Sequence, residues 1–447
     1  MSQITLNNVD NVNTGYSEAF GASLGKMSTH ITRVSRLSRI IHGWTWQAFP
    51  IGMGTGAVYV CLAGVDPDPP HGLHVIQTIF FFMNIVLFLI NTSTLLLQMI
   101  LYPRQAVRLI TDPGKGVFVP LIVLSFATII IGTVNYSVPG GDVRLSPNVL
   151  YILFWIYIGF SLLVCFPMMM IWFNHPHDLT SFTPAWAFLV FPMMLAGVVA
   201  SNVLRVLDPS EGRALGVLLT GYIFQGLGFF MTLFYICIYI IRIMTTGFLE
   251  GQQASGAFIA CGPPGFTALA LMNLGESARS ILVQQNLVSP IAGEVWYATS
   301  VLSALLLFGL AVFFFAFGAL PYWFKLHHRL GEILGCWALT FPNAGWILAL
   351  RKLGDIFDLE AFKILEPRHD YCHIFTATPE ETLRDMRTKR PDLEMALAAS
   401  TQVGIGLVSA VAEENAREAG AQALAASSLP TSMSALGTPE LPSKETS

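Results

Sequence analysis

The sequence predicts an all-α polytopic membrane protein, because charge is scarce and unevenly distributed. Of the 447 residues, 53% are hydrophobic and only 12% are charged. A soluble domain has about 25% charged residues. The shortage is concentrated in long runs without any charge, and these runs have the roughly 20 residues that a helix needs to cross a bilayer. We therefore expect a helical bundle surrounded by the lipid bilayer.

Nine apolar runs without Asp, Glu, Lys or Arg are candidate spans. They cover residues 44–64, 74–101, 117–136, 148–173, 185–204, 214–241, 256–275, 295–324 and 333–350. The residues before the first run are polar, and the last two connections are short. We therefore expect an N-terminal segment at 1–43 and a transmembrane domain at 44–350.

The C-terminal region departs from this pattern, because residues 351–394 are rich in charge. Within the atypical region 351–412, the charge-free run 395–412 is rich in Ala, Gly and Ser, so it is a candidate for a weak tenth span that needs packing partners. Residues 413–447 have the Ala, Ser, Pro and Glu content that is typical of a disordered tail. The expected number of transmembrane helices is therefore nine to ten.

The flanks of the runs differ in their Lys and Arg content, and cytosolic flanks are the richer ones in membrane proteins. The N-terminal flank and the loops after the second, sixth and eighth runs contain Lys26, Arg33, Arg36, Arg39, Arg104, Arg108, Lys115, Arg242, Lys325 and Arg329. The alternate loops contain only Arg144, Arg205, Arg213 and Arg279. This difference predicts a cytosolic N-terminus.

Proline recurs inside the odd-numbered runs. Phe-Pro occurs in the first, fifth and ninth runs, and Gly-Pro-Pro in the seventh, as Phe49-Pro50, Phe191-Pro192, Phe341-Pro342 and Gly262-Pro263-Pro264. Proline inside a helix leaves a carbonyl without its backbone partner, and lipid tolerates this only where protein or water satisfies the carbonyl. The recurrence indicates odd-numbered helices around a shared polar path. The alternative is simple helix packing, since Pro and Gly are common in membrane helices, and Phe166-Pro167 in the fourth run breaks the pattern.

The predicted path carries no formal charge of its own, because Glu276 and Glu294 lie only at the edges of their runs. Helix N-termini bind anions without a counter-charge. An anion on this path would meet such helix ends and the hydroxyl groups of Thr55, Thr128, Thr183 and Thr267. We therefore expect any accompanying proton to be carried by a partly protonated acid.

Other classes of function lack the required residues. The net charge of −4 gives no basic footprint for nucleic acid. The six cysteines have neither metal-ligand nor disulfide-framework spacing. Histidines at 175, 177, 327 and 328 are poorly spaced for a membrane metalloenzyme and are better explained as interfacial loop residues. We therefore expect no enzyme activity, no metal and no cofactor.

Four of the runs carry motifs that are shared with one group of transporters. The motifs are Trp44–Trp46, Met53–Gly56, Thr183–Trp186, Phe191–Gly197, Phe224–Phe229 and Cys261–Leu271. Together they resemble the tellurite-resistance/dicarboxylate transporter family, and most closely its fungal malic acid transport proteins. The family also includes plant slow anion channels and fungal sulfite efflux pumps. The resemblance covers about residues 40–350.

The resemblance implies ten helices, of which five proline-kinked, odd-numbered helices line a central pore. It also implies that a phenylalanine directly before a proline in the ninth helix gates the pore, which places the gate at Phe341; the alternative is a core aromatic. The expected pore and gate residues are Phe341, Pro342, Phe49, Pro50, Pro192, Gly262, Pro263 and Pro264. The missing apolar run after the ninth span departs from the family pattern and puts the tenth helix in doubt.

The resemblance also implies a function. We expect transport of a small organic anion, with malate or a related C4-dicarboxylate as the first choice and sulfite efflux by the same fold as the alternative. The expected location is the plasma membrane, and a homo-oligomer is left open.

The predicted topology can be tested with reporters. A reporter fused within residues 1–43 should be cytosolic, and one inserted between Asp66 and Pro70 should be outside, because the first span separates them. Protease protection of both reporters in sealed vesicles measures this directly. Finding both on the same side would overturn the assignment of the first span.

Overall fold

The computed structural model describes residues 36–63, 71–137, 145–249, 251–325 and 337–359, and every regular element within these ranges is a helix. The all-α prediction is therefore confirmed for this part of the chain. Helix α2 (Arg36–Gly43) belongs to a separate unit of the chain. From Trp44 on, the α-helices are α3 (Phe49–Ala63), α4 (His71–Leu101), α5 (Pro103–Thr111), α6 (Leu121–Ser137), α7 (Pro147–Phe173), α8 (Phe191–Leu204), α9 (Gly212–Thr246), α10 (Gly262–Gln284), α11 (Ala292–Lys325) and α12 (Trp337–Phe357).

Six of the described helical segments are long and apolar enough to cross a membrane. They are Gly72–Leu101, Gly116–Tyr136, Pro147–Phe173, Gly212–Thr246, Gly256–Gln284 and Ala292–Leu320. Each of the nine predicted runs coincides with a helix, but α3 has 15 residues and α8 has 14, which is short of a full crossing. The total of nine to ten spans therefore stays a prediction, and the run 395–412 lies outside the described residues.

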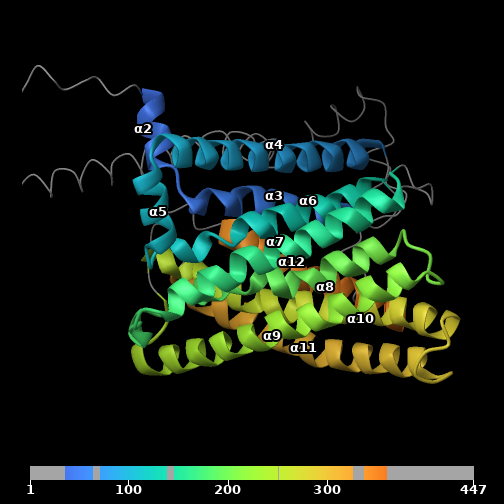
Figure 1. The fold of residues 1–447 in the computed structure, drawn as a ribbon. Helices are drawn as coiled ribbons and strands as arrows, with labels where there is room; N and C mark the ends of the chain where they lie inside the picture. Colours follow the sequence, from blue (N-terminus) through green and yellow to red (C-terminus); the bar gives the residue numbers. More distant parts are fainter. Residues whose placement is uncertain (1–35, 64–70, 138–144, 250, 326–336, 360–447) are drawn as a thin grey trace, which may run out of the picture. The chain divides into compact units, whose positions relative to one another are not determined.

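Five helices form a closed ring. Helix α3 packs against α6, α6 against α8, α8 against α10 and α10 against α12, and α12 packs back against α3. These helices coincide with the first, third, fifth, seventh and ninth predicted runs. Figure 1 shows them in the interior of the bundle, with α4 along one margin and α9 and α11 along the other.

The remaining long helices cover the seams of the ring. Helix α4 packs on α3 and α6, α7 on α6 and α8, α9 on α8 and α10, and α11 on α10 and α12. Burial separates the two layers: the segments through α6 and α10 are 72% and 83% buried, whereas the one through α4 is only 17% buried. The exposed surface of α4 is apolar, as a helix facing lipid requires.

The seam between α12 and α3 has no covering helix in the part of the chain that the structure describes. Each of the other four seams is covered by the helix that connects its two members in sequence. The seam at which the ring closes joins its last helix to its first, so none of the helices that connect one ring helix to the next lies over it.

Four ring helices begin with a change from 3-10 to α-helix. The 3-10 segments are η1 (Trp46–Ala48), η2 (Gly116–Phe118), η5 (Pro184–Leu189) and η6 (Gly251–Cys261), before α3, α6, α8 and α10. Proline occupies the first turn of α3, α8 and α10, where its missing N–H would have no intrahelical partner in any case.

Pro50, Pro192, Pro263 and Pro264 lie in the first turns of α-helices, so kinks at these prolines stay a prediction. Pro342 lies inside α12 and Pro167 inside α7. The sequence signal for a break was sound, but a break can be a change of helix type as well as a kink.

We call each change from 3-10 to α-helix a joint. A row of amide side chains on α4 bonds the backbone at the first joint, between η1 and α3. Gln77, Asn84, Asn91 and Gln98 recur at every seventh position, and all four are buried although α4 is mostly exposed. Asn91 Nδ2 donates to the carbonyl of Ala48 at 3.1 Å, and Gln98 Nε2 donates to that of Trp44 at 3.0 Å. These amides therefore tie α4 to the backbone where the first ring helix starts, because Trp44 lies shortly before η1 and Ala48 directly before α3.

Amide side chains of the outer helices also bond threonine hydroxyl groups of the ring, and this arrangement occurs twice. Asn84 on α4 donates to Thr128 Oγ1 on α6 at 3.1 Å, and Gln225 on α9 donates to Thr267 Oγ1 on α10 at 2.8 Å. A glycine of the preceding ring helix faces each amide, Gly56 in one case and Gly197 in the other. The structure thus contains two similar units, each with an outer helix that links two ring helices.

We predict that Asn91→Leu destabilises the protein by about 0.5–1.5 kcal/mol, because it removes the buried hydrogen bond that joins α4 to the carbonyl of Ala48. Thermal unfolding of the purified protein measures the loss. The matched control is Thr94→Val on an exposed face of α4, where the hydroxyl only bonds its own helix at Ile90. Equal loss in both variants would contradict a specific role for the amide.

Candidate functional site

The ring encloses a cavity of about 650 Å³, which is within the range of small-molecule sites. All five ring helices contribute to its wall, and it extends from their middle turns to their C-terminal ends. Its lining includes Ala57 on α3, Thr128 on α6, Leu195 on α8, Phe266 on α10 and Phe341 on α12. The helices that proline and glycine had marked therefore do surround one shared cavity.

One end of the cavity is apolar and closed by two aromatic rings. Phe341 on α12 and Phe266 on α10 have ring centroids 4.8 Å apart, and their side chains are only 3% and 5% exposed. Both face the cavity. An apolar constriction of this kind excludes hydrated ions, because water leaves it readily.

Close packing of α10 against α12 fixes the two rings. A methyl group built on Gly265 would lie 2.6 Å from the backbone nitrogen of Trp346, and one built on Gly345 would lie 2.7 Å from that of Phe266. A methyl group on Gly262 would approach the Cα atom of Pro342 at 3.2 Å. Glycine at these positions therefore allows the backbones to approach, as small residues do at membrane helix interfaces.

The other end of the cavity is polar and charged. Glu276 lies about 15 Å beyond Phe266 along α10, and Arg351 lies about the same distance beyond Phe341 along α12. The charged residues of the wall are Arg205, Glu276, Arg351, Lys352 and Asp355, and three asparagines join them at positions 135, 202 and 273. The wall thus changes from aromatic to ionic along its length.

Three of these charged residues have defined partners across helices. Lys352 Nζ lies 2.7 Å from Glu276 Oε2, which joins α12 to α10. Arg205 directly follows α8, and its NH1 group donates to Asn135 Oδ1 on α6 at 2.6 Å. Among the described residues, no carboxylate forms an ion pair with Arg205. Its partner is a neutral amide.

Glu276 directly follows the charge-free seventh run, as expected. Helix α10 does not end there but continues to Gln284, so Glu276 belongs to the wall of the cavity. A helix need not end where its charge-free run ends, because a charge that faces a cavity is not exposed to lipid.

Comparison with known proteins identifies the family. Residues 43–367 match the family model described as voltage-dependent anion channel (SLAC1). The chain belongs to this family. The malic acid transport protein of Schizosaccharomyces pombe is 29% identical over 335 residues, which are 73% of this chain and 74% of that protein. The sulfite efflux pump of Arthroderma otae is 26% identical over 338 residues, which are 74% of this chain and 85% of that protein.

Membership of the anion channel family confirms the resemblance that the motifs indicated. It also makes this chain a multi-pass membrane protein of a transporter and channel family, in agreement with its six long apolar segments. A putative malic acid transport protein of Schizosaccharomyces pombe is 26% identical over 341 residues, or 74% of this chain and 77% of that protein. Malate-named and sulfite-named relatives are thus similar to this chain to almost the same degree.

Of the other predicted pore residues of this anion channel family member, Pro342 lies inside α12 directly after Phe341. The rest lie around the 3-10 joints and do not line the cavity. Phe49 is fully buried between Trp46 and Phe88, with ring centroids 6.1 and 6.2 Å away, and it does not line the cavity. Pro50 follows it in the first turn of α3 and is half-buried. The carbonyl of Pro192 accepts a hydrogen bond from Tyr157 at 2.5 Å.

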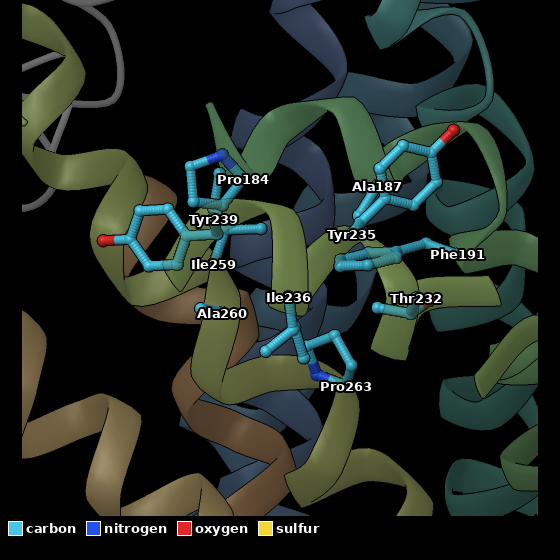
Figure 2. Close-up of a pocket in the computed structure, with 10 residues that line it drawn as sticks. All are labelled: Pro184, Ala187, Phe191, Thr232, Tyr235, Ile236, Tyr239, Ile259, Ala260 and Pro263. Carbon is cyan, nitrogen blue, oxygen red and sulfur yellow. The ribbon is translucent and has the colours of Figure 1, made fainter. Parts of the chain in front are cut away.

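The Gly-Pro-Pro motif forms the first turn of α10 beside a small gap in the packing. Figure 2 shows this gap, which Pro263 lines together with Phe191 and residues of η5, α9 and η6. Its volume is about 10 Å³, which is at the limit for one water molecule. The hydroxyl groups of Tyr235 and Tyr239 point away from its centre (Figure 2). Pro264 is buried in the same turn. These residues shape the joint and leave no room there for an organic anion.

The hydroxyl groups divide between cavity and joints. Of the four threonines that we proposed for an anion, Thr128 lines the cavity. Thr55 donates to its own helix at Ile51, and Thr267 accepts from Gln225. Thr183 precedes η5 and makes no capping bond with its side chain. The described residues contain no group of three or more His, Cys, Asp or Glu that could hold a metal ion.

Sequence reasoning missed the charged wall and Phe266. Arg205 had served only to assign topology, and Glu276 had been placed outside its span. A signal was present, since charges follow the fifth, seventh and ninth runs at their C-terminal ends. It could not be interpreted without the ring, which brings those three helix ends to one cavity.

Proposed function

We propose that this chain transports a small organic anion, most simply malate or a related C4-dicarboxylate, through the cavity of the ring. The single observation that carries the proposal is a cavity that all five ring helices line and that changes from an aromatic end to an end with three basic residues. The charged end attracts an anion from water, and the aromatic end restricts its passage. The first-choice substrate rests on the malic acid transport relatives.

The direction of the cavity follows from the predicted topology. With a cytosolic N-terminus, the ring helices begin at the cytosolic face and end outside, so the charged end opens outward. The aromatic pair then separates this space from the cytosol. A location in the plasma membrane is part of the same proposal, and the arrangement leaves room for a homo-oligomer.

Phe341 is our proposed gate, and Phe266 is its partner. The two rings meet at 4.8 Å and belong to helices whose glycines allow close contact. A small displacement of α12 against α10 would separate them and open the constriction. Phe49, which the same reasoning had suggested, has no such position, because it packs between α3 and α4.

Sulfite efflux is the second candidate. A relative from Arthroderma otae with that name matches the chain over almost the same length as the malate-named proteins. The cavity of about 650 Å³ admits either anion, so the preference for malate rests on the malate-named relatives.

One host can separate the two substrates. We expect expression of this chain in a yeast strain without its own malate carrier to give saturable uptake of labelled malate that other C4-dicarboxylates inhibit. Growth on sulfite should be unchanged. Sulfite tolerance above that of the empty vector, with malate uptake at vector level, would transfer the assignment to sulfite efflux.

The gate is tested by Phe341→Ala. Removal of the ring should raise anion current per surface-expressed molecule severalfold and weaken selectivity, because it widens an apolar constriction. If Phe341 served only packing, truncation would cost about 3–5 kcal/mol and lower the protein level without raising the current per molecule.

The matched control is Phe49→Ala, which removes an equally buried ring that does not line the cavity. It should lower the protein level and leave the current per molecule unchanged. Similar currents in the two variants would remove Phe341 from the gate.

A further inference from the structure

We propose that Arg205 and Lys352 form a two-armed carboxylate site at the charged end of the cavity, in which each cation binds one carboxylate of a dicarboxylate. This inference rests on the proposed function and names the residues that recognise the substrate. The two cations belong to α8 and α12, which are not neighbours in the ring because α10 lies between them. They therefore reach the cavity from two separate parts of its wall.

Each arm has more hydrogen-bond donors than its contacts with the described residues use. A guanidinium group has five N–H donors and an ammonium group has three. Arg205 uses its NH1 group for Asn135, and Lys352 uses one donor for Glu276. The amide of Asn135 anchors the arginine without neutralising its charge. A carboxylate in the cavity would therefore bind a cation that is already held in place. Binding then costs less side-chain conformational entropy than binding to a free side chain.

Glu276 lowers the affinity of the site for an anion. Its side chain is 59% exposed and pairs with Lys352, so it competes with any anion for that arm. The wall carries three basic and two acidic residues, namely Arg205, Arg351 and Lys352 against Glu276 and Asp355. The small positive excess attracts a dianion without holding it so tightly that it cannot move on, as conduction requires.

The inference is testable because substitution of Lys352 and substitution of Glu276 should change the KM for malate in opposite directions. Arg205→Gln and Lys352→Gln should each raise the KM for malate about tenfold, the loss expected for one charge-assisted hydrogen bond of about 1.4 kcal/mol. Glu276→Gln should lower the KM for malate, because it frees Lys352 and removes a like charge. A purely structural ion pair predicts the same effect from both of its variants.

Matched controls exist on the same end of the bundle. Arg213 pairs with Glu211 at 2.6 Å and does not line the cavity, and Arg279 pairs with Glu294 at 2.5 Å in the same way. Arg213→Gln and Glu294→Gln therefore remove a charge of each sign from outside the cavity. Their KM values for malate should equal that of the unaltered protein.

The measurements are KM and maximal uptake per surface-expressed molecule, for malate and for lactate, which has a single carboxylate. Either Gln substitution of an arm should reduce the preference for malate over lactate, and Arg205→Lys should restore part of it. KM values for Arg205→Gln and Lys352→Gln that stay within about twofold of the controls would overturn the site. So would a rise in KM for Glu276→Gln.

A binding measurement separates this site from the transport proposal. Malate should raise the melting temperature of the purified unaltered protein and of Arg213→Gln, but much less that of Arg205→Gln. This result supports the site even if vesicles show no malate flux, in which case only the transport proposal fails. Malate flux with equal protection of all three proteins overturns the site alone. Absence of both flux and protection overturns both.

Discussion

The bundle depends on how broken backbones are satisfied where water is absent. Where a helix begins inside the bundle or a proline removes a donor, the backbone groups without an intrahelical partner must bond other protein groups. The outer helices provide these groups, since Asn91 and Gln98 on α4 bond the carbonyls of Ala48 and Trp44. Amides on α4 and α9 also hold the threonines of α6 and α10. The outer layer therefore screens the ring from lipid and also makes its irregular helices possible.

The ring in turn explains why the cavity has two different ends. At the closed end, glycines on α10 and α12 bring the backbones close enough for Phe266 and Phe341 to meet. Toward the helix C-termini no such contact occurs, and the wall holds asparagines and charged residues instead. In the proposed function, affinity for an anion and resistance to its passage would therefore lie at different depths of the cavity. Each could then change without the other, in a family that contains both transport proteins and channels.

Much of this could be predicted from the sequence, because periodic and compositional signals are local. The nine helical segments, the family and the position of Phe341 beside Pro342 all follow from short stretches of chain. The joints at Pro50, Pro192 and Pro263 were located correctly but interpreted as kinks, since proline fits either geometry. The charged wall could not be predicted, because Arg205, Glu276 and Lys352 are far apart in sequence and meet only through the ring. Phe266 had no signal of its own beside the Gly-Pro-Pro motif.

The contact between α12 and α3 has a consequence for biogenesis. The ring is closed by its first and last members, which are separated by almost the whole transmembrane chain. Membrane helices leave the ribosome in the order of the sequence, so one side of α3 lacks its packing partner until α12 has been made. Long-range contacts of this kind form late, because the chain must first be ordered between them. Until α12 is made, the α3 and α10 flanks that it will join therefore both lack their ring partner, and the cavity has no complete wall.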